Sequence, residues 1–498
     1  MVKRIDDCLS AREGHLFVED CDAVDLIERF GSPLFVMSED QIRRNVRRFR
    51  DAFQRGWPYG PVRVLPAAKA NWLPAVQRIL ADEGCGSDVY SLGELIIALD
   101  AGFDRQEISV NGVPKDEDLI YRCVREGVSV TVDSGEEVPL IERAARDLNR
   151  PVRVRLRMKP VISGFVGHSG FVAEGLVPAD IASMVYKGGL TLEEIRAIGP
   201  RLLGMENVEL VGLHQHHGRH DPSTRYWKAQ MRAFAVEAGK VSRILGGFQP
   251  REIDIGGGFA VPRDPFNAVT DYGEPLQLAA FHAVSKGMTL LGSSARYKVL
   301  SGLMNTVTKR PNGRPAPTIE EYARVCTDTL GYELPRNGIR MEGLKLQIEP
   351  GRAIHGNAGI HLTTVKSIKR MKTPIHWNRL IVDTTEFWFT GGKYEHHLHA
   401  CLLANRTEAP IADKADIVGR SCYGERIMPM VPVPDVKIDD ILAFLDTGAY
   451  QEVSMSNFNA IPRPATVLVT GDRADVVRRR ETEEDLLFRD VIPERLKR

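Results

Sequence analysis

Short apolar runs alternate with amphipathic helical patterns between about residues 34 and 255. The apolar runs predict buried strands, and apolar residues spaced three or four positions apart predict helices. Strands are expected at residues 62–67, 86–89, 108–111, 128–132, 152–156, 208–214 and 253–255, and helices at residues 41–53, 71–83, 92–101, 115–126 and 136–148. Regular alternation predicts a parallel α/β architecture, and a count of units approaching eight favours a TIM-type (β/α)8 barrel over an open sheet.

The pattern changes after about residue 359, where β-rich runs are separated by turns that contain Gly and Pro. Strands are expected at residues 360–368, 380–383, 441–444 and 466–470. We therefore expect a barrel domain over residues 34–358 and a C-terminal β domain over residues 359–498. Residues 262–317 fit no clear period and contain several prolines, which predicts an insertion or lid within the barrel domain.

Length and charge restrict the class of protein. A chain of 498 residues is too long for one ordinary domain. Lys plus Arg and Asp plus Glu are equal at 66 each, which argues against a nucleic-acid partner. Seven cysteines without paired spacing favour the reducing cytoplasm over a disulfide framework. The N-terminus has no apolar signal segment and no stretch is long enough to span a membrane, so we expect a cytoplasmic protein without a membrane partner.

Three stretches far apart in the chain offer complementary chemistry. Lys69 follows an apolar run, and an amine that has lost part of its hydration can attack an aldehyde. Gly256, Gly257 and Gly258 offer backbone amides without side chains, which suits a phosphate. Glu349 stands before Pro-Gly-Arg and can hold a protonated pyridine nitrogen. Together the three stretches indicate a site for pyridoxal 5′-phosphate.

Five further blocks follow the same order along the chain: GSDVYSLGEL at residues 86–95, GLHQHHG at residues 212–218, GRSC at residues 419–422, GAY at residues 448–450 and FN at residues 458–459. With these blocks the chain resembles, from about residue 34 to residue 469, the alanine racemase-like (fold type III) pyridoxal phosphate-dependent decarboxylases. This group contains the diaminopimelate, ornithine and arginine decarboxylases. The resemblance implies a TIM-type barrel and a β domain that residues 1–33 join. It also implies a homodimer whose active sites are shared between subunits.

The resemblance also implies roles for individual residues that bind the cofactor. Lys69 would carry the cofactor covalently, and His216 would stack on the face of its ring. Glu349 would pair with the pyridine nitrogen, Asp88 would lie near the ring in a supporting role, and Tyr450 would hydrogen-bond the phosphate. These residues form the expected cofactor site, together with the glycine triplet.

Three more residues complete the expected catalytic machinery. Gly351 and Arg352 complete the block that begins with Glu349 and are implied to bind the cofactor. Arg352 also resembles the residue that engages a substrate carboxylate in the diaminopimelate enzymes. Cys422 resembles the cysteine that arrives from the partner subunit and returns a proton to the substrate after carbon dioxide leaves.

The histidines of the GLHQHHG block have an alternative interpretation as metal ligands. Alternation along a strand places His214 and His216 on one face and His217 on the other. Too few ligands then converge nearby, so we expect no metal.

The chain departs from the family at several positions that bear on the substrate. The diaminopimelate and ornithine enzymes have an acidic residue directly after the cysteine, whereas this chain has Tyr423, with Glu425 two positions further on. We expect Tyr423, Glu425 and Arg352 to contact the substrate. Arg219 replaces the usual serine, and the sequence does not rank a phosphate contact, a substrate contact or a surface position for it. Glu386 is a further acidic residue that could bind an amine from a new direction.

We therefore expect decarboxylation of a basic or diamino acid, including one with a D centre. A racemase or epimerase is the first alternative, although racemases of this fold prefer an arginine where Glu349 stands. A non-catalytic cofactor carrier is the second alternative, and the expected β domain argues against it. A decarboxylase of a conjugated or carrier-bound amino acid is the third, with residues 262–317 as a docking surface.

Overall fold

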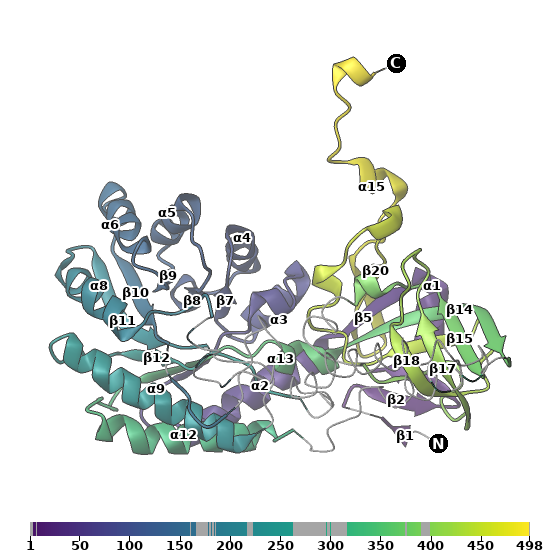
Figure 1. Cartoon of the computed structure of the whole chain (residues 1–498), viewed down its shortest axis with the longest axis horizontal. Coiled ribbons are helices and arrows are strands. Elements are labelled where there is room, and N and C mark those ends of the chain that lie inside the picture. The colour runs from purple at the N-terminus through teal and green to yellow at the C-terminus, as the bar shows by residue number, and fades with distance from the viewer. Residues whose placement is uncertain are drawn as a thin grey trace. The chain divides into compact units, whose positions relative to one another are not determined.

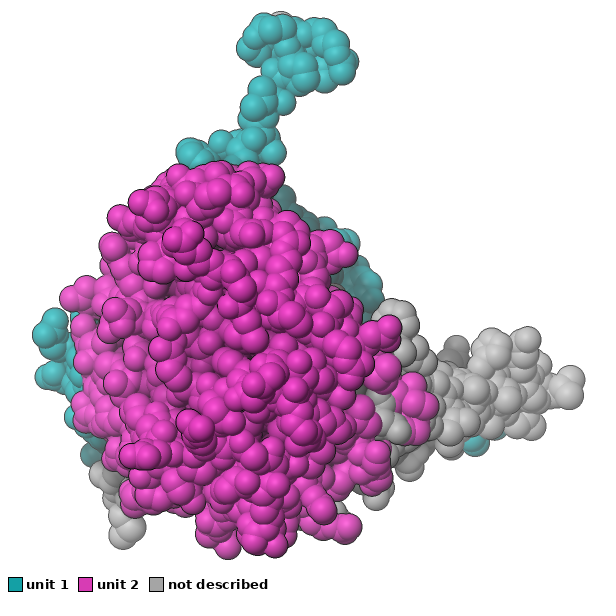
Figure 2. Space-filling model, turned by 90° about the vertical axis from the view of Figure 1, so that its left-hand side faces the viewer, with its two compact units in different colours: residues 1–41, 279–308, 356–498 teal, residues 42–278, 309–355 magenta. Residues whose placement is uncertain are grey.

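The computed structural model describes two compact units, coloured differently in Figure 2. The barrel unit comprises residues 42–278 and 309–355, and the β unit comprises residues 1–41, 279–308 and 356–498. The residues that the structure describes are 3–5, 7–159, 161–165, 178, 181, 184, 186–216, 223–261, 295, 299, 316–373, 376–389 and 399–497. The insertion expected over residues 262–317 therefore lies almost entirely outside the described residues.

Eight parallel strands form the sheet of the barrel unit. They are β6 (Val62–Val64), β7 (Ser87–Val89), β8 (Ile108–Val110), β9 (Ser129–Val132), β10 (Val152–Arg157), β11 (Val208–His214), β12 (Glu252–Asp254) and β13 (Lys345–Ile348). From β7 to β13 each strand pairs with the next in sequence, and β13 pairs with β6. A bridge between Ala67 and Asp88, together with a 2.9 Å hydrogen bond from the Gly86 amide to the Val64 carbonyl, joins β6 to β7. The prediction of a TIM-type barrel is therefore confirmed.

Helices follow the barrel strands and lie outside them, as α4, α5, α6 and α8 show clearly in Figure 1. Among the described residues, the helices of eight or more residues that lie wholly or mostly in this unit are α2 (Glu39–Gly56), α3 (Pro74–Asp82), α4 (Leu92–Ala101), α5 (Glu117–Glu126), α6 (Glu137–Asp147), α8 (Leu192–Gly204), α9 (Thr224–Ile244) and α12 (Ile319–Arg336). Side-chain caps fix several starts: Ser91 accepts from the Glu94 amide, and Asp116 accepts from the Leu119 amide. The predicted helix at residues 92–101 coincides with α4.

An aromatic cluster in the barrel unit holds the end of the glycine triplet. Phe259 follows the triplet, is only 2% exposed, and stacks on Trp227 of α9 with ring centroids 4.5 Å apart. Tyr322 of α12 and Phe49 of α2 meet the same ring at 5.5 Å. Such buried aromatic contacts are favourable and directional. They therefore fix where the chain leaves the glycine triplet.

The β unit contains a mixed sheet with the strand order β18 (Met428–Pro434), β17 (Ile411–Val418), β15 (Trp377–Val382), β14 (Gly359–Met371), β5 (Leu34–Ser38), β20 (Ala465–Thr470) and β21 (Arg473–Arg478). In addition, β19 (Ile441–Phe444) pairs with β14 and with β16 (Cys401–Leu403). This architecture agrees with the expected β domain. The predicted strand at residues 441–444 coincides with β19.

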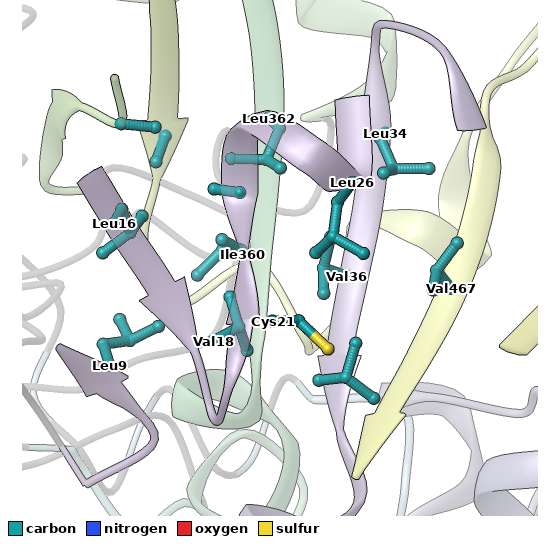
Figure 3. Close-up of a cluster of buried hydrophobic side chains, with 14 of the residues drawn as sticks. Leu9, Leu16, Val18, Cys21, Leu26, Leu34, Val36, Ile360, Leu362 and Val467 are labelled. Carbon is teal, nitrogen blue, oxygen red and sulfur yellow. The ribbon is translucent and has the colours of Figure 1, made fainter. Parts of the chain in front are cut away.

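The N-terminal residues pack in the β unit. Four short strands, β1 (Lys3–Arg4), β2 (Leu9–Arg12), β3 (His15–Val18) and β4 (Cys21–Asp22), form an antiparallel sheet that is followed by α1 (Ala23–Phe30). Figure 3 shows Leu16 and Leu26 from this segment in one apolar cluster with Val36, Ile360 and Val467. Burial of these side chains attaches the segment to the sheet.

Residues 34–38 differ from the sequence expectation, which assigns them to the start of the barrel domain. The structure places them in β5, which pairs antiparallel with β14 and parallel with β20. All five residues are buried, as in a central strand covered on both faces. A continuous apolar run predicts such a strand but carries no information about which sheet receives it.

In the described part of the chain, no helix combines the length and apolar character needed to cross a membrane.

Candidate active site

Polar side chains gather at the carboxyl ends of the barrel strands. The set comprises Lys69 after β6, Asp88 in β7, Asn111 after β8, Asp133 after β9, Arg157 in β10, His214 and His216 at and after the end of β11, Asp254 in β12 and Glu349 after β13. The carboxyl ends of parallel barrel strands lie at one end of the barrel, which is where barrel enzymes place their active sites. The structure therefore brings together the barrel residues that the sequence indicated.

Lys69 lies on a single turn of 3-10 helix, η1 (Ala68–Ala70), shortly after β6. Ala68 and Ala70 on either side are buried, while Lys69 itself is exposed. Burial raises the pKa of Glu349, and the positive charge of Lys69 opposes this shift. The amine therefore acts electrostatically on the carboxylate of Glu349.

Glu349 is a buried carboxylate of the site and is only 3% exposed. The side-chain Nδ2 of Asn111 donates to Oε1 of Glu349 at 2.5 Å, and Nε2 of His214 lies 3.3 Å from the same oxygen. Nδ1 of His216 lies 3.7 Å from Oε2. Burial is the main reason that the pKa of Glu349 is raised. A cation placed against this carboxylate would stabilise its charged form.

Asn111 connects Glu349 to a second carboxylate. The side-chain Nδ2 of Asn111 also donates to Oδ1 of Asp88 at 2.7 Å, and its side-chain oxygen Oδ1 accepts from the Ser109 hydroxyl at 3.0 Å. Burial, followed by the negative charge of Glu349, raises the pKa of Asp88 to about 6. Asp88 thus belongs to the same buried network as Glu349.

His216 is held as a neutral imidazole. The backbone amide of Gly257 donates to its Nδ1 at 3.2 Å, so this nitrogen carries no proton and the ring proton is on Nε2. Burial lowers the pKa of His216 well below its usual value, and the positive charges of Lys69 and Arg157 lower it further. A neutral ring in this position can pack on an aromatic cofactor without adding charge.

The glycine triplet is required by close backbone approaches. A Cβ atom on Gly257 would lie 2.1 Å from the carbonyl oxygen of Glu349, and one on Gly256 would lie 2.6 Å from the carbonyl oxygen of Gln215. Gly256 and Gly258 have φ values of 72° and 97°, which disfavour other residues. The triplet therefore lets two strand ends come together.

Two of the three glycine amides are already bonded to side chains. Gly256 donates to Oδ1 of Asp254 at 2.9 Å, and Gly257 donates to His216. The sequence assigned all three amides to a phosphate. The structure directs the first two to the site's own side chains, so the phosphate contact remains a prediction for Gly258.

Several members of the site were not predicted from the sequence. Arg157 donates to Oδ2 of Asp133 at 2.8 Å, and the amide of Gly189 donates to the other oxygen of Asp133 at 2.6 Å. Arg155 lies between Glu252, at 2.6 Å, and Asp254, at 3.4 Å. Their position in or just after barrel strands was the available signal, because charged residues inside a barrel are rare unless paired.

The buried side chains of His214, Asp254 and Glu349 offer three potential ligand atoms within 4.8 Å of one another. Two observations favour the cofactor network over a metal centre. Both Asp254 oxygens already accept, from Gly256 and Arg155, and burial raises the pKa of Asp254 well above its usual range. Nδ1 of His214 has no hydrogen-bond partner among the described residues, whereas a metal-bound histidine usually donates from its second nitrogen.

Gly351 and Arg352 directly follow Pro350, next to Glu349. Arg352 begins the short helix α13 (Arg352–His355), and its side chain is only 2% exposed. A buried guanidinium beside the site is suited to an anionic group. His217 and Arg219 lie outside the described residues.

Cys422 belongs to the β unit and is exposed. Its amide donates to Oδ1 of Asn459 at 2.9 Å, and Nδ2 of Asn459 donates to its Sγ at 3.2 Å. Tyr450, in the same unit, has a φ of 66°, which is unusual for a residue other than glycine and is often found at functional sites.

Glu425 has a different place from the one expected. It is 4% exposed, and its carboxylate accepts from the Ser421 amide at 2.8 Å, the Thr385 hydroxyl at 3.1 Å and the Glu386 amide at 2.5 Å. A Cβ on Gly419 would lie 1.9 Å from Oε2 of Glu425. These contacts fasten the loop that carries Cys422, so we no longer expect Glu425 to contact the substrate.

Three aromatic rings lie beside this loop. Phe387 and Phe458 stack with centroids 4.2 Å apart, and Tyr423 meets Phe387 edge-on at 5.8 Å. Tyr423 is 53% exposed and Phe458 is 39% exposed. The position after the cysteine therefore presents an aromatic surface in place of a carboxylate. The half-buried Glu386 donates its amide to Glu425 and lies next to Phe387.

The residues of the barrel unit fit pyridoxal 5′-phosphate. Glu349 is a buried carboxylate whose charged form would be stabilised by a protonated ring nitrogen. Gly257 lets the backbone of the triplet approach Glu349 more closely than a residue with a Cβ atom could, and its amide holds His216 as a neutral ring. Lys69 supplies the exposed amine that the cofactor's aldehyde requires.

The chain is similar in sequence and in fold to known pyridoxal-dependent enzymes. Residues 39–287 match the family described as "Pyridoxal-dependent decarboxylase, pyridoxal binding domain". The diaminopimelate decarboxylase of Methanothermobacter thermautotrophicus is 29% identical, over 97% of this chain and 97% of its own length. That of Actinosynnema pretiosum subsp. auranticum is 30% identical, over 96% of this chain and 93% of its own length. The structure of the M. jannaschii diaminopimelate decarboxylase in co-complex with L-lysine is 26% identical, has a TM-score of 0.79 and covers 99% of each chain. The chain therefore belongs to the pyridoxal-dependent decarboxylase family, and it is a pyridoxal 5′-phosphate-dependent amino acid decarboxylase.

Proposed function

We propose that the chain decarboxylates a basic or diamino acid, of L or D configuration at the reacting carbon. The observation that carries this proposal is the buried carboxylate of Glu349 at the end of β13. Bound pyridoxal 5′-phosphate supplies a ring that accepts the electron pair left when the carboxylate departs as carbon dioxide. Glu349 would keep the ring nitrogen protonated, which maximises this capacity. An arginine at this place, as in racemases of the fold, would reduce it.

The barrel residues would hold and orient the cofactor. Lys69 would bind it covalently through Nζ, and the neutral ring of His216 would pack against it. Asp88, through Asn111, would help to hold Glu349 in place. Arg352 would bind an anionic group of the cofactor or the substrate. Each role uses the side chain in the surroundings that the structure gives it.

Residues of the β unit would contribute the proton and part of the substrate site. Cys422 would return a proton to the carbon that has lost carbon dioxide, and Tyr450 would hydrogen-bond the phosphate. Tyr423 and Phe387 would face the distal end of the substrate with their rings. Aromatic rings attract ammonium and guanidinium groups by about 0.5–2 kcal/mol, whereas a charge-assisted hydrogen bond contributes about 1.5–3 kcal/mol. We therefore expect a distal-group preference that differs from that of relatives with an acidic residue after the cysteine.

The proposal also includes the oligomeric state and the location of the protein. We propose a homodimer with sites shared between subunits, and a cytoplasmic location, which agrees with seven cysteines that are all free thiols. Mixing Lys69→Ala and Cys422→Ala proteins tests the shared site. In heterodimers one site of each pair would be intact, so about a quarter of wild-type activity should return. No recovery after subunit exchange would contradict a shared site.

The activity itself is tested by mass spectrometry of products. Cofactor-loaded protein would be incubated with D- and L-ornithine, lysine, arginine and the diaminopimelate stereoisomers. Loss of carbon dioxide from a basic or diamino acid supports the proposal and gives its stereochemistry. Deuterium uptake from heavy water without loss of carbon dioxide would identify a racemase instead. If no member reacted, the basic or diamino acid proposal would be withdrawn in favour of a conjugated substrate.

A further inference from the structure

The loop that carries Cys422 is held from two directions within the β unit. On one side, Glu425 accepts from the Ser421 amide and from groups of residues 385–386. On the other side, Asn459 accepts the Cys422 amide at Oδ1 and donates from Nδ2 to Sγ. Glu425 therefore fixes the backbone of the loop, whereas Asn459 is the side chain that bonds to the sulfur atom.

The backbone around Asn459 is built to present its side chain. Asn459 lies in η8 (Phe458–Ala460) with φ 61° and ψ 20°, a left-handed conformation that asparagine adopts more readily than most residues. Its neighbour Phe458 stacks on Phe387 at 4.2 Å and 23°. The stacked ring holds the segment, and the left-handed turn directs the amide of Asn459 to Cys422.

The hydrogen bond to sulfur has a direct chemical consequence. An N–H donor stabilises electron density on sulfur, so it favours the thiolate that remains after a thiol has given up its proton. While the sulfur is protonated and accepts from Nδ2 of Asn459, its own S–H bond must point away from that amide. Asn459 thus controls both the direction of the proton and the charge that its departure leaves.

We propose that Asn459 is the positioning residue for proton delivery by Cys422. This inference rests on the proposed function, in which the S–H bond of Cys422 breaks and a C–H bond forms at the substrate carbon that has lost carbon dioxide. The sulfur keeps the electron pair as a thiolate, Nδ2 of Asn459 stabilises that charge, and solvent returns a proton to the sulfur. No oxidant or reductant takes part.

The test compares two substitutions that affect the two hydrogen bonds differently. Asn459→Asp keeps an oxygen for the Cys422 amide but replaces the donor to Sγ with a second, negatively charged oxygen. Asn459→Gly removes both bonds and relieves the left-handed backbone. Asn149 provides a matched control, because it is an exposed asparagine with a φ of 47° in the barrel unit. Asn149→Asp and Asn149→Gly repeat the same chemistry away from Cys422.

The main readout needs neither cofactor nor substrate. Cofactor-free protein would be treated with iodoacetamide at neutral pH, and alkylation of the Cys422 peptide would be followed by mass spectrometry. Among the seven cysteines only Cys422 is exposed, so its signal is readily separated. Asn459→Asp should slow this alkylation about tenfold, because the thiolate loses a donor and gains a negative neighbour. Both Asn149 variants should react at the wild-type rate.

A second readout uses the holoenzyme. Asn459→Asp and Asn459→Gly should lower kcat while leaving KM within about twofold of the wild type, because the affected step follows substrate binding. Melting temperatures of the variants establish that they fold. Alkylation of folded Asn459→Asp at the wild-type rate or faster would overturn the proposal. If wild-type protein released no carbon dioxide from any substrate while the alkylation difference persisted, the hydrogen bond to sulfur would stand and the proposed function would fail.

Discussion

The amide of Gly257 donates a hydrogen bond to Nδ1 of His216 at 3.2 Å. This contact couples the two best sequence signals of the barrel unit, a glycine triplet and a histidine block, into one element. The backbone amide can only donate, so the imidazole must accept at Nδ1 and carry its proton on Nε2. The glycine triplet therefore sets which ring nitrogen carries the proton, in addition to allowing the close approach of the backbone to Glu349.

Substitution of Gly257 by alanine should remove cofactor binding. The new Cβ would lie 2.1 Å from the Glu349 carbonyl oxygen, which is backbone and cannot rotate away. We expect destabilisation of about 1–3 kcal/mol and loss of the visible absorbance of the lysine-bound cofactor. Gly204→Ala is the control, because its Cβ would meet nothing within 4 Å. Normal cofactor absorbance in Gly257→Ala would contradict the steric argument.

Replacement of Glu349 by glutamine should separate cofactor binding from chemistry. The amide preserves the shape of the side chain but removes the charge that would hold a proton on the ring nitrogen. We expect kcat to fall about 100-fold, the usual scale for a lost electrostatic contact in an active site, while cofactor stays attached to Lys69. The exposed Glu342→Gln is the control. Stopped-flow and steady-state rates measure the effect, and unchanged kcat would remove Glu349 from the proposed role.

The substitution Tyr423→Glu should change substrate preference. It restores an acidic side chain directly after Cys422, where an ammonium group would gain about 1.5–3 kcal/mol from a charge-assisted hydrogen bond. We expect kcat/KM to rise for substrates with a distal ammonium relative to all others. Tyr332→Glu, at a similarly exposed tyrosine of α12, serves as the control. An unchanged ranking of substrates would show that residue 423 does not face the distal group.

Substitution of Glu425, in contrast to that of Tyr423, should lower the rate without changing the substrate preference. Glu425→Gln places an amide group where two backbone N–H groups and a hydroxyl donate, so at least one of these donors loses its acceptor. The loop should loosen and kcat should fall about tenfold, with the ranking of substrates unchanged. The exposed Glu408→Gln is the control. A changed ranking, measured over the same amino acid panel, would return Glu425 to the substrate site.

His355 should contribute to acid sensitivity. It is fully buried, its ring nitrogens have no hydrogen-bond partner among the described residues, and burial lowers its pKa from 6.5 to about 3. A lowered histidine pKa gives stability that is present above pH 6.5 and is lost as the pH falls towards 3, because the unfolded chain binds the proton more tightly. His355→Leu should therefore flatten this part of the stability curve.

Urea unfolding between pH 7 and pH 4 measures the effect of His355→Leu. At pH 7 the variant should be at least as stable as the wild type, since it removes an unsatisfied buried polar group. The difference in its favour should grow as the pH falls. Parallel curves for the two proteins would exclude His355 as a source of acid sensitivity.

The sequence determined much of this fold by local patterning. The helix at residues 92–101 and the strands at residues 208–214 and 441–444 have the predicted bounds, because their apolar periods and caps act within one element. Regular alternation also predicted the barrel. Strand β13 was not predicted from the sequence.

For the site, the sequence identified residue types but not their contacts. Lys69, His216 and Glu349 lie at the carboxyl ends of barrel strands, as blocks that follow strands should. Pairing partners depend on which strand ends meet, and this is set by closure of the sheet. The bonds of Asn111 to Glu349 and of Arg157 to Asp133 therefore became visible only in the structure.

Tertiary structure alone decided three further matters. It placed β5 in the β unit, because a strand buried on both faces fits either sheet and long-range pairing makes the choice. It turned the amides of Gly256 and Gly257 towards side chains, because the φ angle of each glycine is unconstrained by its own sequence. It buried Glu425 within its loop, because a buried carboxylate needs hydrogen-bond donors, and two of its three donors come from residues about forty positions away.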